Sequence, residues 1–267
     1  GGKYDGTCAI KTPVLSIITK IGYDHMKILG NDIKQIAKEK AGILKKGTHL
    51  VCAPQKEEAY EVITVACRDM NIPISHIKDV DINILSRDIS DGCIFSYKGV
   101  QYKCNLLGDY QCENAAVVID AVDILREKGF DITDMALREG LTKSCWPGRM
   151  QLLSDKPFLL IDGCHNITGV MALKNSLISY MPKEKFTFVM GVMADKDYVS
   201  MVRQLKPIAN EFVTYTPDSN RALDSVKLKD KIEDMKLTAK NISSVEEFIS
   251  KDSYKNNEKN EDFRIIF

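Results

Sequence analysis

The stretch FLLIDGCHNITGVMALKNSLISYMPKEKFTFVM, residues 158–190, decides the fold. It opens with a four-residue apolar run at Phe158–Ile161 and continues into helical spacing over Gly169–Met181. A second apolar run follows at Phe186–Met190. Short apolar runs separated by a helix are typical of a βαβ unit, in which the two strands are parallel. We therefore predict an α/β fold with a mostly parallel sheet here.

The same alternation continues to the end of the chain. Further strands are predicted at Glu211–Thr214 and Phe263–Phe267, and further helices at Asp197–Leu205, Val226–Met235 and Val245–Lys251. The pair Pro147-Gly148 marks the point at which the alternation begins. We therefore place a domain boundary near residue 147, with one domain over 1–147 and a Rossmann-like α/β domain over 148–267.

The first of these domains shows a different order of elements. Gly99 follows Lys98 between two short β-prone runs, which predicts a hairpin. The other predicted strands are Pro13–Thr19, His49–Ala53 and Ile72–Ile77, and the predicted helices are Asp32–Ala41, Pro54–Met70, Asn114–Lys128 and Ile132–Leu141.

Composition narrows the class of protein. The 267 residues contain 37 Lys and Arg against 37 Asp and Glu, so the chain lacks the basic excess of a non-specific nucleic-acid binder. No apolar run approaches the roughly 20 residues that span a bilayer. The 8 cysteines form no Cys-x-x-Cys pair, which favours reduced thiols and a cytoplasmic protein. We expect no nucleic-acid or membrane partner.

Two residues of the first domain are candidates for metal chemistry. His25 follows a predicted buried strand, where a neutral imidazole can ligate a cation. Lys40 follows Ile36 by four residues, so it projects from the apolar side of its helix, where a neutral amine can react with carbon dioxide to give a carbamate. The alternatives are a surface-loop histidine and a lysine whose amine reaches water.

Three residues near the boundary are candidates for anion and nucleotide binding. Arg149 follows a glycine that allows the backbone to turn, and its guanidinium can bind a phosphate. Asp162 ends a strand, where it can accept hydrogen bonds from ribose hydroxyls. His165 precedes a helix capped by Asn166 or Thr168, whose N-terminus presents free N–H groups to an anion. A linker arginine and a tight strand–helix turn are the alternatives.

Two further polar segments remain open. Gln111 and Asn114 lie one turn apart at a predicted helix start, where they cap the helix or contact a purine edge. Lys196 lies between two acids directly after the strand Phe186–Met190, either as part of a site or as a surface charge.

Seven segments taken in order resemble the folylpolyglutamate synthase / dihydrofolate synthase family of the Mur-ligase superfamily. They are Gly22–Gly30 (GYDHMKILG), Ile36–Gly47 (IAKEKAGILKKG), Gln111–Ala116 (QCENAA), Trp146–Arg149 (WPGR), Ile161–Asn166 (IDGCHN), Gly191–Asp197 (GVMADKD) and Arg221–Leu223 (RAL). The resemblance implies the rest of a P-loop-type central domain over 1–147 and a C-terminal Rossmann-like domain over 148–267.

The resemblance also implies an activity: ATP-dependent addition of glutamate to the γ-carboxylate of a folate, through an acyl phosphate. ATP and Mg²⁺ are the implied cofactors, and folate and L-glutamate the substrates of an enzyme expected to be a monomer. His25 and the carbamylated Lys40 would hold Mg²⁺. Asn114 and Arg149 would contact ATP, Asp162 its ribose, His165 the phosphate region, and Lys196 the acyl phosphate or the glutamate.

The chain departs from the family pattern in ways that lead to a further expectation. The family's Gly-Thr-Asn-Gly-Lys-Gly-Ser phosphate loop and a metal-binding Glu do not occur in it, so one of the two metal sites is incomplete. Tyr110 and Ile167 stand where His and Pro are usual. We expect a piece of a longer protein that is inactive alone. Dihydrofolate synthase activity and a degenerate nucleotide-binding or interaction module are the alternatives.

Overall fold

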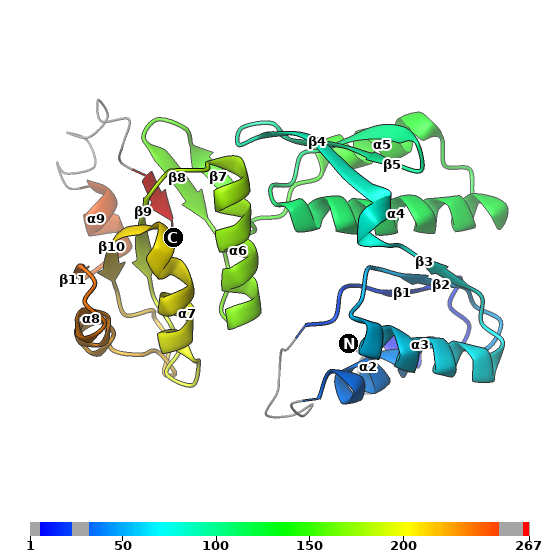
Figure 1. Ribbon diagram of the computed structural model, residues 1–267, viewed down its shortest axis with the longest axis horizontal. Coiled ribbons are helices and arrows are strands. Elements are labelled where there is room, and N and C mark those ends of the chain that lie inside the picture. The colour runs from blue at the N-terminus through cyan, green and yellow to red at the C-terminus, as the bar shows by residue number, and fades with distance from the viewer. Residues whose placement is uncertain (1–5, 23–31, 251–263, 267) are drawn as a thin grey trace. The chain divides into compact units, whose positions relative to one another are not determined.

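The computed structural model describes residues 6–22, 32–250 and 264–266, which form two compact units (Figure 1). The first unit comprises Gly1–Ser86, Cys93–Asn105 and Asp109–Ser144. The second comprises Arg87–Gly92, Leu106–Gly108 and Cys145–Phe267.

A three-stranded parallel sheet forms the base of the first unit. Its strands are β1 (Ser16–Ile18), β2 (Leu50–Cys52) and β3 (Ile74–His76), in that order across the sheet. The helices α2 (Ile33–Ala41) and α3 (Glu57–Met70) connect them and pack against each other. These five elements confirm the predicted strands and helices of this region, with shorter strands.

Helix α2 forms where the sequence predicts it because its cap and its apolar positions agree. The carboxylate of Asp32 accepts a hydrogen bond from the backbone N–H of Lys34 at 2.9 Å. Ile33, Ile36, Ala37 and Ala41 are buried in one cluster with residues of β2 and α3. The side of the helix that carries this stripe therefore faces the core of the first unit.

A second three-stranded sheet and two helices complete the first unit. The strands are β4 (Ile82–Asp88), β5 (Gly92–Tyr97) and β6 (Val100–Cys104), and the helices are α4 (Asp109–Glu127) and α5 (Asp134–Lys143). The hairpin between β5 and β6 is confirmed: Lys98 and Gly99 both have positive φ, as a two-residue turn of this kind requires. Strand β4 was not predicted.

Helix α4 corrects one expectation. It begins at Asp109, five residues before the predicted start at Asn114, directly after Gly108 with its φ of 104°. Gln111 and Asn114 therefore lie inside the first two turns, so neither residue caps the helix. Their side chains pair instead, with the Asn114 amide donating to Gln111 Oε1 at 2.9 Å.

The second unit is built on one six-stranded sheet of order β11-β10-β9-β12-β8-β7. All neighbouring strands are parallel except β7 and β8, which confirms the mostly parallel α/β fold. Strand β12 lies between β8 and β9, so the end of the sequence pairs at the centre of the sheet. The strands are β7 (Gln151–Ser154), β8 (Phe158–Ile161), β9 (Phe186–Met190), β10 (Ala209–Thr214), β11 (Ala239–Asn241) and β12 (Arg264–Ile266).

Helices cover this sheet on both faces. Alternate residues of a strand point to opposite faces, and Leu159, Val189 and Val213 form a cluster with Phe248 of α9 (Val245–Ser250). Rings of the opposite alternation, Phe186 and Phe188, line the other face. The remaining helices are α6 (Ile167–Tyr180), α7 (Tyr198–Leu205) and α8 (Ser225–Asp234), and short 3₁₀ turns occur at Gly6–Ala9, Asp79–Asp81 and Lys206–Ile208.

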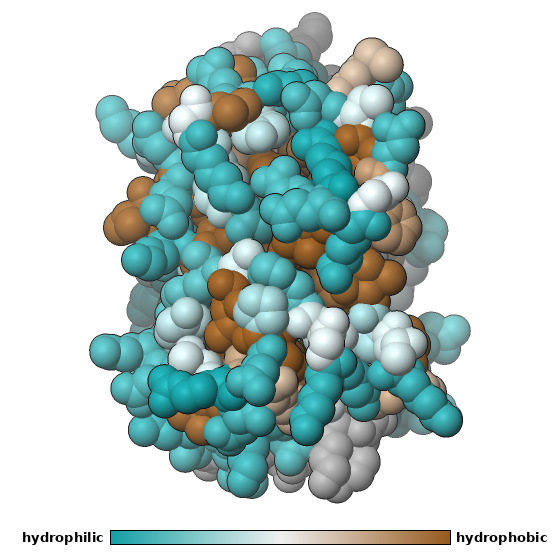
Figure 2. All heavy atoms as spheres, turned by 90° about the vertical axis from the view of Figure 1, so that its right-hand side faces the viewer, coloured by the Kyte–Doolittle hydropathy of each residue, from teal (hydrophilic) through white to brown (hydrophobic). Residues whose placement is uncertain are grey.

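One face of the molecule carries both polar and apolar residues (Figure 2). Hydrophilic residues interrupt the hydrophobic areas on the face that Figure 2 shows. Among the described residues, no helix combines the length and the apolar character needed to cross a bilayer.

Candidate active site

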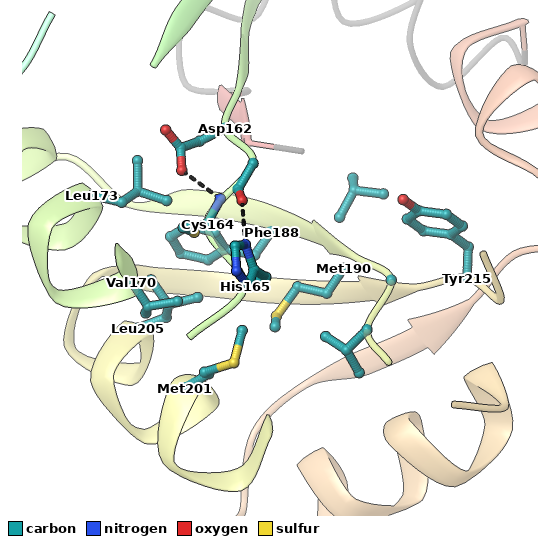
Figure 3. A pocket seen from close by; sticks show the side chains of 14 residues that line it. Asp162, Cys164, His165, Val170, Leu173, Phe188, Met190, Met201, Leu205 and Tyr215 are labelled. Atoms are coloured by element: carbon teal, nitrogen blue, oxygen red, sulfur yellow. Dashed lines mark hydrogen bonds between the residues drawn. The ribbon is translucent and has the colours of Figure 1, made fainter. Parts of the chain in front are cut away.

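In the turn after β8, one carboxylate binds two segments of the second unit. Asp162 accepts a hydrogen bond from the Met150 N–H through Oδ2 and another from the Cys164 N–H through Oδ1, each at 2.8 Å. Figure 3 shows the second of these bonds at the base of the turn. The N–H of Gly163 donates to the carbonyl of Gly148 at 2.7 Å. The segment around Arg149 is thereby fixed against the carboxyl end of β8.

Two residues at this junction have a positive φ angle. Gly148 has a φ of 71°, and Met150 has a φ of 41° although it carries a side chain. Residues other than glycine rarely adopt this left-handed region. The Met150 side chain is buried and its N–H is bound by Asp162, so packing and a charge-assisted hydrogen bond hold the unusual conformation.

Little space surrounds Gly163. A Cβ atom there would lie 3.3 Å from the Gly148 carbonyl oxygen and 3.8 Å from Arg149 Nη1. The Arg149 guanidinium, on an exposed residue, therefore lies beside the turn that contains Asp162. The structure thus brings Arg149 and Asp162 together, although they are 13 residues apart in sequence.

His165 lies at the start of α6 and is exposed. Its Nδ1 is 3.1 Å from the Gly163 carbonyl, which can only accept, so Nδ1 carries a proton and Nε2 remains an acceptor in the neutral ring. Asn166 caps α6 by accepting the Gly169 N–H at 2.8 Å, which decides between the two predicted caps. The free N–H groups of the first turn of α6 therefore lie beside His165.

The cysteine of this motif is not a nucleophile. Burial, followed by the neighbouring carboxylate of Asp162, raises the pKa of Cys164 far above its ordinary value. The thiol therefore stays protonated at neutral pH, and a protonated thiol is a poor nucleophile.

The connection after β9 pairs two of the quoted motifs with each other. The N–H of Ala194 donates to the carbonyl of Arg221 at 2.8 Å, and the N–H of Leu223 donates to Val192 at 2.8 Å. The Arg221 guanidinium lies 2.9 Å from both carboxylate oxygens of Asp195 and lowers the pKa of that carboxyl. Lys196 follows directly and is half-buried. This pairing between the two motifs was not predicted.

A pocket of about 260 Å³ opens between the two strand-end turns (Figure 3). Asp162 and His165 lie on its polar side, and Tyr215 lies at another edge. Most of its other side chains are apolar and come from α6, α7 and β9, among them Val170, Leu173, Met201, Leu205, Phe188 and Met190. Sequence reasoning missed this pocket because its lining resembles ordinary core.

Gly191 lies at the edge of the pocket, and its position in the sequence could have indicated close packing there. A Cβ atom on Gly191 would lie 2.6 Å from Tyr215 Cζ and 2.7 Å from Pro217 Cγ. A glycine directly after a buried strand is consistent with such a close approach. Gly191 therefore allows the Tyr215 ring to lie against the end of β9.

The first unit holds the other candidates. Lys40 is half-buried on α2, next to the buried Ala41, and its ammonium has no ion-pair partner among the residues that the structure describes. Asn114 is exposed on α4. Beside it, Glu113 binds Lys20 at 2.9 Å, which joins α4 to the chain just after β1. His25 lies outside the described residues.

The described part of the chain contains no group of three or more His, Cys, Asp or Glu residues arranged to hold a metal ion. Lys40 in its ammonium form is a donor of hydrogen bonds and cannot ligate a cation. A metal site at Lys40 therefore stays a prediction that depends on carbamylation and on residues such as His25.

Comparison with known proteins places these motifs in a family. The Mur ligase, glutamate ligase domain matches residues 148–260. A dihydrofolate synthase/folylpolyglutamate synthase of Bacillus subtilis is 36% identical over 217 residues, which is 79% of this chain and 50% of the relative. The chain belongs to the folylpolyglutamate synthase / dihydrofolate synthase family.

Two further members of the folylpolyglutamate synthase / dihydrofolate synthase family are also similar to this chain. A folylpolyglutamate synthase of Lacticaseibacillus casei is 32% identical over 84% of this chain and 53% of its own length. A Mycobacterium tuberculosis folylpolyglutamate synthase, solved with ADP and AMPPCP, matches 100% of this chain and 62% of its own length, with a TM-score of 0.83 and 25% identity. The chain thus spans about half the length of the curated relatives it matches.

Proposed function

We propose that this chain takes part in the ATP-dependent joining of glutamate to a carboxylate of a folate-type acceptor, through an acyl-phosphate intermediate. The observation that carries the proposal is the Asp162 junction. It holds an exposed guanidinium, an exposed imidazole and the N-terminus of a 14-residue helix at one strand end. Such a set suits a phosphate group, because donors and positive charge converge on it.

The proposed roles follow from what each side chain has available. Arg149 presents a planar guanidinium that can bind a phosphate through two hydrogen bonds. His165 lies beside the helix N-terminus and would bind a phosphate oxygen through Nε2–H in its protonated form, in which both ring nitrogens donate. Asp162 already accepts two backbone N–H groups, so its first role is to hold the turn. Its remaining lone pairs can accept from ribose hydroxyls.

Lys196 and Asn114 have less constrained roles. Lys196 lies in the connection after β9, and we propose that its ammonium stabilises the charge of the acyl phosphate or the carboxylate of the incoming glutamate. Asn114 pairs with Gln111 and keeps one amide hydrogen and its carbonyl oxygen exposed, which can meet the edge of an adenine ring.

We propose that Mg²⁺ is required, with Lys40 as a carbamate and His25 as ligands. When bound, the cation would neutralise phosphate charge. Lys40 fits this role in one respect, because the amine is half-buried and without an ion-pair partner among the described residues. Carbon dioxide would convert the amine into a carboxylate-like oxygen donor.

Two acceptors fit the proposal: the acceptor of a folylpolyglutamate synthase and the acceptor of a dihydrofolate synthase. The relatives carry the names of folylpolyglutamate synthase, dihydrofolate synthase or both. Both activities join glutamate to a carboxylate that ATP has activated. The proposed roles of Arg149, Asp162 and His165 are the same in either case.

Nucleotide binding tests the proposal in the chain as it stands. We expect ADP to perturb NMR signals of residues 148–166, and Arg149→Ala to weaken this binding about tenfold or more, which is about 1.4 kcal/mol. Arg203→Ala is the matched control, since Arg203 is an exposed arginine on α7 of the same unit. Equal binding by the two variants would contradict the proposed phosphate contact.

Turnover gives a separate test. The phosphate-binding loop of the family does not occur in these 267 residues, so we infer that the purified chain alone does not elongate folate. ATP- and glutamate-dependent folate elongation by the isolated chain would overturn that inference while leaving the assignment of the ligase reaction intact.

A further inference from the structure

Three thiols meet where the β5–β6 hairpin reaches the first turn of α4. Cys93 lies on β5, Cys104 opposite it on β6, and Cys112 on α4. All three are buried, with 2%, 3% and 0% of their surfaces exposed. None has a role in the proposed ligase reaction.

Two of these sulfur atoms are much closer than a simple core contact needs. The Sγ atoms of Cys93 and Cys112 lie 2.6 Å apart, and both cysteines are free thiols. A disulfide bond is about 2.05 Å long, so only a small shift separates the two atoms from bonding distance.

We propose that Cys93 and Cys112 are a site of reversible oxidation, at which a disulfide bond links β5 to the start of α4. This inference does not rest on the proposed ligase function. The bond would make a covalent loop of the chain between residues 93 and 112. It would also fix the first turns of α4, which contain Gln111 and Asn114.

Geometry favours Cys112 over Cys104 as the partner. Cys93 and Cys104 are directly opposite in the antiparallel ladder. Opposite Cβ atoms in such a ladder are about 4.5–5.5 Å apart, whereas a disulfide needs about 3.5–4.5 Å. The helix is free of this constraint, so the Cys112 sulfur can approach Cys93 from outside the ladder.

The reaction balances with a low-molecular-weight disulfide such as oxidised glutathione as the oxidant. One protein thiolate attacks it, forms a mixed disulfide and releases one small thiol. The second protein thiolate then attacks the mixed disulfide at the protein sulfur and releases the other small thiol. Two protein thiols are oxidised, one small disulfide is reduced, and the two thiol protons end on the two released thiols.

The reaction must be slow in the folded protein. A hydrogen bond with Cys104 lowers the pKa of Cys93, but the hydrogen bond with Cys112 and burial outweigh it and raise the pKa to about 12. The thiolate is therefore rare at neutral pH, and the oxidant reaches the pair only when the open end of the hairpin separates from α4.

The experiment is a thiol count and a linkage map of the whole chain. After incubation with oxidised glutathione and removal of the excess, we expect Cys93 and Cys112 not to react with an alkylating agent in denaturant, whereas a glutathione adduct on the exposed Cys145 is counted separately by its own peptide. Dithiothreitol should restore the reactivity of all eight cysteines. Trypsin followed by chymotrypsin separates Cys104 from Cys112, because Leu106, Leu107 and Tyr110 lie between them.

The map should show one peptide pair joined through Cys93 and Cys112. The link should be lost in Cys112→Ala and retained in Cys104→Ala, a matched change in the same cluster. A link from Cys93 to Cys104, a stable glutathione adduct on Cys93 or Cys112, or reactive thiols at both positions after prolonged incubation would each overturn the proposal. The map of the unaltered chain decides the outcome even if a variant fails to fold.

Discussion

The two units hold their candidate polar groups in different ways. In the second unit, Asp162 and Gly191 follow directly after β8 and β9, and short hydrogen bonds or close contacts fix the turns that contain them. In the first unit, Lys40 and Asn114 lie on the sides of α2 and α4.

This difference separates two kinds of positioning. A residue at a strand end is placed by the sheet, whose parallel strands bring their carboxyl ends to one edge. A residue on a helix side is placed by the packing of that helix, so its surroundings depend on distant residues. In the second unit, the positions of the candidate groups should therefore depend on single side chains that bind the backbone. In the first unit, they should depend on the burial of the residues around each helix.

The largest effect should come from Lys40. In an active enzyme that contains this sequence, Lys40→Ala should lower the rate about a hundredfold or more, because a metal ligand and its charge are lost. Lys38→Ala, on the exposed side of the same helix, should leave the rate unchanged. Bicarbonate should not restore the Lys40→Ala variant, whereas a short carboxylic acid should restore part of its activity.

A direct readout accompanies this rate measurement. Carbon-13 bicarbonate should give a carbamate signal in NMR spectra of the unaltered chain, and Lys40→Ala should remove that signal. Full activity of the Lys40→Ala variant, together with no carbamate signal from the unaltered chain, would show that Lys40 is not a metal ligand.

Asp162 tests the strand-end junction of the second unit. Asp162→Ala leaves the N–H groups of Met150 and Cys164 without their acceptor in a half-buried turn. We expect the free energy of unfolding in urea to fall by about 2–4 kcal/mol. Asp155→Ala, in the exposed turn before β8, should change it by less than about 0.5 kcal/mol. A similar loss in both variants would show that the junction is not held by Asp162.

Local sequence determined much of this second unit. Strands β8 and β9 have the predicted bounds because each is a continuous apolar run, and Asn166 caps α6 as one of the two predicted candidates. Strands β7 and β11 were missed because they are short and half-polar, and pairing with a neighbouring strand stabilises them.

Contacts between distant segments were beyond sequence reasoning. The bond from Met150 to Asp162 spans 12 residues, and no periodicity reports it. The pairing of Val192 and Ala194 with residues near Arg221 has the same character. In the first unit, the predicted start of α4 was too late: Cys112 lies three residues before Ala115 and continues the buried side of the helix, but a single apolar residue among polar neighbours was not enough to indicate it.

Gly191 tests close packing at the end of β9. Gly191→Ala places a Cβ atom against the Tyr215 ring and Pro217, so the ring or the backbone must move. We expect a loss of about 1–3 kcal/mol in the free energy of unfolding. Gly140→Ala in α5 of the first unit is the matched change. Nothing lies within 4 Å of its Cβ, and helix propensity should raise stability by about 0.5–1 kcal/mol. Effects of the same sign would contradict this distinction.

The smallest effect should be a pH slope from the first unit. His76 on β3 stacks on Tyr60 with ring centroids 3.7 Å apart, and its buried Nε2 has no hydrogen-bond partner among the described residues. Burial, followed by the charge of Lys78, lowers the pKa of His76 below its ordinary 6.5, against the opposing charges of Asp81 and Asp79. The unfolded chain therefore binds a proton more readily than the folded chain near that pH.

The sign of the slope follows by linkage. The contribution of His76 to stability is fully present above pH 6.5 and is lost as the pH falls from 6.5 towards the lower pKa of the folded state. Urea unfolding at several pH values should show this fall in the unaltered chain and a smaller fall in His76→Asn. An equal fall in both would assign the slope to other groups, because only His76 differs between the two chains.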